Sequence, residues 1–143
     1  MAAVSRLSTV VELADGSDAR RLSVSARHEA VLADGRRVVL LDDRGWTEEL
    51  RVTAGGDAPP LGIWAHETVA EIERTARVVV GPDEPFEGRT QAEMEATHWE
   101  RLAGVLQQEG IEIRAADLRA LPHGVELGDR VLARLGVRHR DST

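Results

Sequence analysis

The chain has 143 residues, of which 42% are hydrophobic and 30% are charged, and this is the balance of a soluble globular protein with one core. It contains no Cys and no Lys, which excludes thiol nucleophiles, disulfides, cysteine-ligated metals, Schiff-base chemistry and Walker A phosphate loops. The net charge of −7 disfavours binding to nucleic acids and to anionic membranes. The partner that this charge favours is a protein, and in particular a basic one.

Residue usage also indicates a source and a location. Lys and Asn, which have AT-rich codons, are absent, whereas Arg, Ala and Gly, which have GC-rich codons, are frequent. This bias indicates a bacterial genome of high GC content. No apolar run approaches the roughly 20 residues that span a membrane. The first 16 residues lack the apolar core of a secretory signal, so we expect a cytoplasmic protein.

Residues 1–53 are predicted to be mainly β, as an antiparallel meander of four to five strands. Asp34–Gly35 favours a type I′ hairpin turn, and residues 42–45 predict a further turn. The stretch 38–41 is apolar on both faces, so we expect this strand at the centre of the sheet or against helices. The predicted strands span residues 7–13, 20–26, 29–33, 36–41 and 47–53.

Residues 65–136 are predicted to be mainly α and follow a Gly- and Pro-rich loop at 54–60. Thr68 and Glu71 predict the start of a helix that ends at Gly81, although three consecutive valines leave a strand at 77–80 as an alternative. A longer helix is predicted to begin with a capping box at Thr90 and to end at Gly110. Its expected apolar stripe consists of Ala92, Ala96, Trp99, Leu102, Ala103 and Leu106.

Smaller elements complete the prediction. We expect a short strand at 111–113, a helical turn at 116–120, a last helix closed by Gly136, and a frayed tail at 137–143. The sequence therefore predicts a single α+β domain over residues 1–143, in which two main helices and a short C-terminal helix pack on the meander. Trp99 is expected to be almost fully buried against the strand at 36–41.

The candidates for chemistry are few. Glu95 and His98 have the Glu-x-x-His spacing that binds a metal in di-metal carboxylate bundles, but the chain lacks the second motif that such sites need. An ion pair between Glu95 and an Arg is the favoured alternative. His66–Glu67 matches only the start of the zinc-protease motif, because the second His is missing. The histidines are scattered along the chain, so we expect no metal and no cofactor.

Two classes of function fit these residues. The favoured one is a small, acidic, non-enzymatic protein-binding module of the immunity-protein, antitoxin or accessory-subunit type. The alternative is a small enzyme or ligand-binding protein that uses Glu95 and His98 with nearby carboxylates.

The partner-binding residues are expected in the Pro-framed acidic loop that precedes the longer helix. Asp83, Glu84 and Glu87 lie there, and their carboxylates would attract a basic partner. Trp46 and Trp64 are a second candidate surface because Trp is favoured at binding hot spots. In a chain so poor in aromatic residues, however, packing in the core is the favoured role of both.

Overall fold

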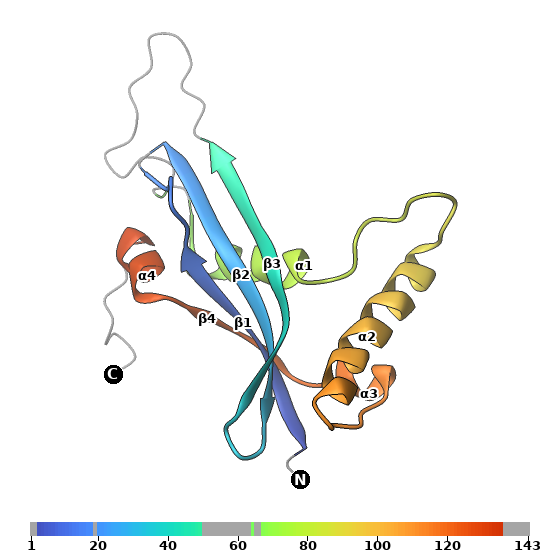
Figure 1. Ribbon diagram of the computed structural model, residues 1–143. Coiled ribbons are helices and arrows are strands. Elements are labelled where there is room, and N and C mark those ends of the chain that lie inside the picture. The colour runs from blue at the N-terminus through green and yellow to red at the C-terminus, as the bar shows by residue number, and fades with distance from the viewer. Residues whose placement is uncertain (1–2, 19, 50–63, 65–66, 136–143) are drawn as a thin grey trace.

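The N-terminal part of the chain forms three long antiparallel strands joined by glycine-containing turns (Figure 1). The computed structural model describes residues 3–18, 20–49, 64 and 67–135. The hairpin predicted at Asp34–Gly35 is present, but only Gly35 has a positive φ, of 91°. Its turn is therefore a three-residue loop ending in a left-handed glycine, not the expected type I′ turn. The strands are β1 (Val4–Leu13), β2 (Arg21–Leu32) and β3 (Arg37–Glu49).

The strands are fewer and longer than predicted. The stretches 20–26 and 29–33 belong to the single strand β2, and 36–41 continues through the expected turn at 42–45 into β3. In place of that turn, the β2–β3 register shifts twice, and each shift leaves one extra residue on β3. Such bulges bend a strand without ending it, and they tolerate the exposed Asp42 and Asp43 on an edge strand. The loop at 54–60, the part of the last predicted strand beyond residue 49, and the tail at 137–143 lie outside the described residues.

A fourth strand, β4 (His123–Leu127), was not predicted and pairs in parallel with β1. The sheet order is β3-β2-β1-β4, so β3 is an edge strand and not the central one. Leu40 of β3 is nevertheless buried, so the alternative that this strand packs against helices is correct. The short strand expected at 111–113 is wrong, because these residues form an irregular connection.

Four helices are present in the described part of the chain, and the two longest begin at the predicted caps, whereas Gly136, the predicted end of the last helix, lies outside the described residues. The Thr90 hydroxyl accepts from the Glu93 amide at 3.1 Å and the Glu93 carboxylate accepts from the Thr90 amide at 3.2 Å, which confirms the capping box. The alternative of a strand at 77–80 is excluded, because the helix continues through Val79. None of these helices is long and apolar enough to cross a membrane. They are α1 (Val69–Val79), α2 (Gln91–Gln108), α3 (Ala115–Arg119) and α4 (Asp129–Leu135).

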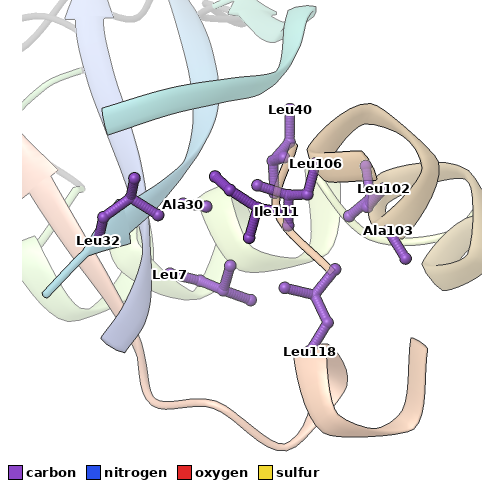
Figure 2. Packing of buried hydrophobic residues seen from close by; sticks show 9 residues of the cluster. All are labelled: Leu7, Ala30, Leu32, Leu40, Leu102, Ala103, Leu106, Ile111 and Leu118. Atoms are coloured by element: carbon purple, nitrogen blue, oxygen red, sulfur yellow. The ribbon is translucent and has the colours of Figure 1, made fainter. Parts of the chain in front are cut away.

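All four helices contribute to packing on one face of the sheet, as predicted for an α+β fold, and this packing forms two apolar clusters. The first cluster lies between the sheet, α2 and α3 (Figure 2). The second lies between the sheet, Trp64, α1 and α4. Paired residues of neighbouring strands share a face, so Thr9, His28 and His123 also point toward the helices. The first cluster consists of Leu7, Ala30, Leu32, Leu40, Leu102, Ala103, Leu106, Ile111 and Leu118.

The buried face of α2 is rotated from the predicted stripe. Ala92 and Ala96 are exposed, and Trp99 is only partly buried at the flank of the first cluster, so its expected full burial is wrong. The reason is that the buried positions recur every four residues from Met94. His98 therefore occupies a buried position, and Trp99 lies at the edge of the buried face. The buried residues of α2 are Met94, His98, Leu102, Ala103 and Leu106.

Gly45 tests the close contact between β2 and β3. A Cβ at this position would lie 2.5 Å from the Val24 carbonyl oxygen, so Gly45→Ala should lower the free energy of unfolding by about 1–3 kcal/mol. Gly104 in α2 is the matched control, because nothing lies within 4 Å of an added Cβ. Gly104→Ala should raise the free energy of unfolding by about 0.5–1 kcal/mol. Urea denaturation measures both changes, and similar effects of the two substitutions would contradict the β2–β3 register.

Candidate functional site

The candidate site is a pocket where α2 passes the connection between α1 and α2. Helical spacing places Met94, Thr97, His98 and Arg101 on the same side of α2, since side chains three, four and seven residues apart lie one above the other. These side chains and others from β3 and the connection line an open pocket of about 80 Å³. Of the residues that line this pocket, the sequence predicted only His98 and Asp83 as candidate site residues. The lining residues are Arg44, Asp83, Phe86, Arg89, Met94, Thr97, His98 and Arg101.

The connection that covers the pocket, residues 81–89, is called loop 81–89 below, and specific contacts position it. Arg44 on β3 donates from Nη1 to Oδ1 of Asp83 at 3.0 Å. Near the other end, the Arg89 amide donates to the Phe86 carbonyl at 3.0 Å, and Glu87 and Gly88 take positive φ values of 52° and 78°. The capped start of α2 follows directly. The loop is therefore tied to β3 at one point and to α2 at its end.

The lining of the pocket is positively charged although the chain is acidic. Three guanidinium groups, of Arg44, Arg89 and Arg101, face one carboxylate, that of Asp83. Asp83 is paired with Arg44, whereas neither Arg89 nor Arg101 forms an ion pair with a described residue. The Arg89 guanidinium lies 5.5 Å from the centre of the Phe86 ring, an arrangement that leaves its hydrogen-bond donors available. Within the described part of the chain, the pocket thus offers two cations, Arg89 and Arg101, that have no ion-pair partner.

His98 is the buried polar group of this pocket. It is only 7% exposed, and its Nε2 has no hydrogen-bond partner in the described part of the chain. Burial and the charges of Arg44 and Arg101 lower the pKa of His98, and Asp83 and a hydrogen bond to the Val80 carbonyl offset only part of this effect. The pKa of His98 therefore lies below its ordinary value of about 6.5, and the neutral ring predominates at pH 7.

Glu95 and His98 do not converge on one ligand. Glu95 accepts from Nη2 of Arg119 at 3.0 Å, which confirms the ion pair expected from the sequence. It lines a different cavity, together with Trp99 and Arg119. Among the described residues no group of three His, Asp or Glu side chains is arranged to hold a metal.

His28 and His98 lie edge-on to Trp99 and His123 stacks on His28, a cluster that the sequence analysis did not predict. The His28 ring stacks on that of His123 with centroids 4.9 Å apart, and the Trp99 ring lies edge-on to His98 at 5.2 Å and to His28 at 6.5 Å. His123 also forms a hydrogen bond of 2.6 Å with Thr9 through Nε2. The alternation of β2 was a usable signal, because it places His28 on the same face as the buried Ala26 and Ala30.

Burial governs the titration of this cluster. It lowers the pKa of His28 to about 3, assisted by His123 and His98, and it also lowers the pKa of His123. Neither ring nitrogen of His28 has a hydrogen-bond partner among the described residues. The cluster is therefore neutral at pH 7 and acts as part of the core.

The Glu67 carboxyl group, which does not line this pocket, has a strongly raised pKa. Burial and the neighbouring carboxylates of Glu48 and Glu71 raise its pKa to about 8, so it keeps its proton at neutral pH. None of the three lines the pocket at α2. His66, its partner in the incomplete zinc-protease motif, lies outside the described residues.

The predicted partner-binding residues divide between surface and core. Glu84 and Glu87 are exposed on loop 81–89, whereas Asp83 is engaged by Arg44. Trp64 is 2% exposed in the second cluster, and Trp46 packs against the same cluster, as expected for core residues. The arginines of the pocket were not singled out, because β3, the loop and α2 meet only in the folded chain.

Comparison of the chain with protein families, with characterised proteins and with solved structures finds no match.

The cost of charging His28 can be measured through the pH dependence of stability. An unfolded His has a pKa near 6.5, so the unfolded chain takes up this proton first as the pH falls. The free energy of unfolding should then decrease from about pH 6.5 down to about pH 3, by at most about 1.4 kcal/mol per pH unit for this proton. His28→Leu should remove this dependence. At pH 7 the variant should be at least as stable as the wild type, because it loses two buried nitrogens that have no hydrogen-bond partner among the described residues.

Urea denaturation of both proteins between pH 4 and pH 7 provides the measurement. The difference between them reports the titration of His28 together with its coupling to His98 and His123, since Glu67 and the other titrating groups are common to both. A difference that does not change with pH would show that His28 is not held neutral by burial.

Proposed function

We propose that the protein is a non-enzymatic protein-binding module, of the immunity-protein, antitoxin or accessory-subunit type, which binds its partner through loop 81–89. The observation that supports this is Phe86, the one Phe in the chain, which is 50% exposed. Phe is enriched in protein interfaces, and burying such a ring contributes about 1.5–3 kcal/mol. Val78, in the last turn of α1 before the loop, is 71% exposed and extends the apolar character of this region along the chain.

The way in which the loop is held favours binding. The Arg44–Asp83 ion pair and the turn at Phe86 fix the ring before a partner arrives. A loop that is already ordered loses less conformational entropy on binding, so more of the contact energy appears as affinity.

The charges around Phe86 indicate the kind of partner. Glu84 and Glu87 flank the ring, are exposed, and form no ion pair with a described residue. Asp83 serves a different purpose, because its carboxylate anchors the loop to β3. The surface fits a protein with an apolar pocket rimmed by Lys or Arg, whose approach the two carboxylates accelerate. We place this interaction in the cytoplasm of a bacterium with a high-GC genome, as residue usage indicates.

The alternative function, a small enzyme that uses Glu95 with His98, has less support. The two side chains line different cavities, and Glu95 is engaged by Arg119. A shared catalytic role would require both groups to face one substrate.

Capture of partners from a high-GC bacterial lysate, followed by binding kinetics with the purified partner, tests this function. We expect one stoichiometric protein that Phe86→Ala fails to retain. The double variant Glu84→Arg/Glu87→Arg should slow association at low salt, and the difference from the wild type should shrink as added salt shortens the Debye length toward about 3 Å.

The matched control is Glu109→Arg/Glu112→Arg, which makes the same charge change beyond the far end of α2. It should bind like the wild type. Retention of the partner by Phe86→Ala, or equal slowing by both charge-reversal variants, would show that loop 81–89 is not the binding surface.

A further inference from the structure

An open groove of about 310 Å³ lies between α2 and α3, and its lining is mainly apolar. Trp99 lines this groove and is only partly buried, because it packs at the flank of the first cluster. Three alanines line the groove beside it, and their small side chains leave the space between the two helices unfilled. These alanines are Ala96, Ala115 and Ala116.

The groove is separate from the pocket at loop 81–89, since the two share no lining residue. Successive residues of a helix are about 100° apart around its axis. Ala96 and Glu100 therefore project from the side of α2 that is opposite to Met94 and His98. A function of this groove does not depend on partner binding by loop 81–89.

The charged groups of the groove leave one carboxylate uncompensated. Glu95 accepts from Nη2 of Arg119 at 3.0 Å, so these two lining groups balance each other. Glu100 is exposed and forms no ion pair with a described residue. The groove therefore carries a net negative charge beside an apolar wall. This combination complements a positively charged group on an apolar stem.

The side chains of Arg and Lys have this chemistry, because each buries an aliphatic stem while its charged head reaches a polar partner. Trp attracts cations through its ring electrons more strongly than Phe or Tyr does. A guanidinium also forms paired, charge-assisted hydrogen bonds with a carboxylate. The contact between Arg119 and Glu95 shows that a guanidinium is accommodated at the rim of this groove.

We propose that the groove between α2 and α3 is a docking site for an Arg or Lys side chain that a basic protein partner presents. The cationic head of that side chain donates to Glu100, and its stem lies along Trp99 and Ala96. The net charge of the chain, −7, attracts such a partner over a longer range. Arg119 competes with the incoming cation, because it already occupies Glu95.

Nuclear magnetic resonance titration of the isotope-labelled full chain with Nα-acetylarginine amide, at constant ionic strength, tests the proposal. The indole N–H resonance of Trp99 should shift saturably, with a dissociation constant of about 10 mM, whereas those of Trp46 and Trp64 should not move. Nα-acetylcitrulline amide has nearly the same shape but no charge, and it should bind about fivefold more weakly. Nα-acetyllysine amide should bind like the arginine probe.

Matched substitutions on α2 assign the binding to the groove. Glu100→Gln should weaken binding of the arginine probe about fivefold, whereas Glu109→Gln, at the end of α2 and outside the groove, should leave it unchanged. Ala96→Leu fills the groove without changing its charge and should also weaken binding. Ala92→Leu is its control, because Ala92 is exposed one turn earlier and does not line the groove.

Removal of the resident guanidinium gives a change in the opposite direction. Arg119→Gln frees Glu95 for the probe and should tighten binding about threefold. Arg74→Gln on α1 makes the same charge change outside the groove and should have no effect.

Several results would overturn the proposal. They are no saturable shift of the Trp99 indole up to about 100 mM probe, equal binding of the arginine and citrulline probes, or equal effects of the two substitutions in either α2 pair. A dimer in analytical ultracentrifugation that Ala96→Leu dissociates would also overturn it, since the occupant would then be a second copy of the chain. Circular dichroism checks that each variant is folded, and Glu100→Gln keeps the test decisive if Ala96→Leu does not fold.

Discussion

The constraint on which the rest of the structure depends is the direction of the two edge strands. β1 is antiparallel to β2, β2 is antiparallel to β3, and β4 is parallel to β1, so β3 and β4 run the same way at opposite edges of the sheet. Parallel strands cannot be joined by a hairpin, and the chain between them has to cross a face of the sheet. That crossing places α1, loop 81–89, α2 and α3 on one face. It also brings the loop and α2 beside Arg44, and the pocket is a consequence of this geometry.

The opposite face of the sheet is stabilised by charge instead. Arg37 donates from Nη1 to Glu126 at 2.7 Å and to Glu29 at 3.0 Å, and Arg27 donates to the other oxygen of Glu29 at 2.7 Å. Glu29 is buried, and its two guanidinium partners compensate the lost hydration. The hydrogen bonds from Arg37 and from Ser8 lower the pKa of Glu126 and add a link to β1. This satisfied polar network is unlike an apolar docking face, which is why we place partner binding on loop 81–89.

The sequence predicted correctly those parts of the fold that depend on interactions between residues close together in the chain. The ends of α1 and α2 follow from Thr68, Thr90 and the residues three positions later, because a cap is made within one helical turn. β4 was missed because a strand of five residues gains its stability from a distant partner in β1. The continuation of β3 past Asp43 was missed for a related reason, since a bulge and a turn draw on the same polar residues.

The candidate site was predicted only in fragments. His98 and Asp83 were each singled out, but for a metal motif and for a partner surface, and only the fold shows that they face one pocket. Trp is more hydrophobic than His, so the sequence predicted that Trp99, and not His98, is buried. The predicted buried face of α2 was therefore displaced by one residue from the actual one. Arg44 and Arg101 carry no local signal, because guanidinium groups on a strand and on a helix are ordinary surface residues until the chain brings them together.

The parallel pairing of β4 with β1 tests this account most directly, because it makes the chain cross one face of the sheet. The measurement is the set of nuclear Overhauser contacts between backbone protons of the two strands in the isotope-labelled protein. Contacts in parallel register, with Leu7 beside His123 and Val11 beside Leu127, are the predicted result. An antiparallel pattern, or the absence of contacts between these strands, would contradict it.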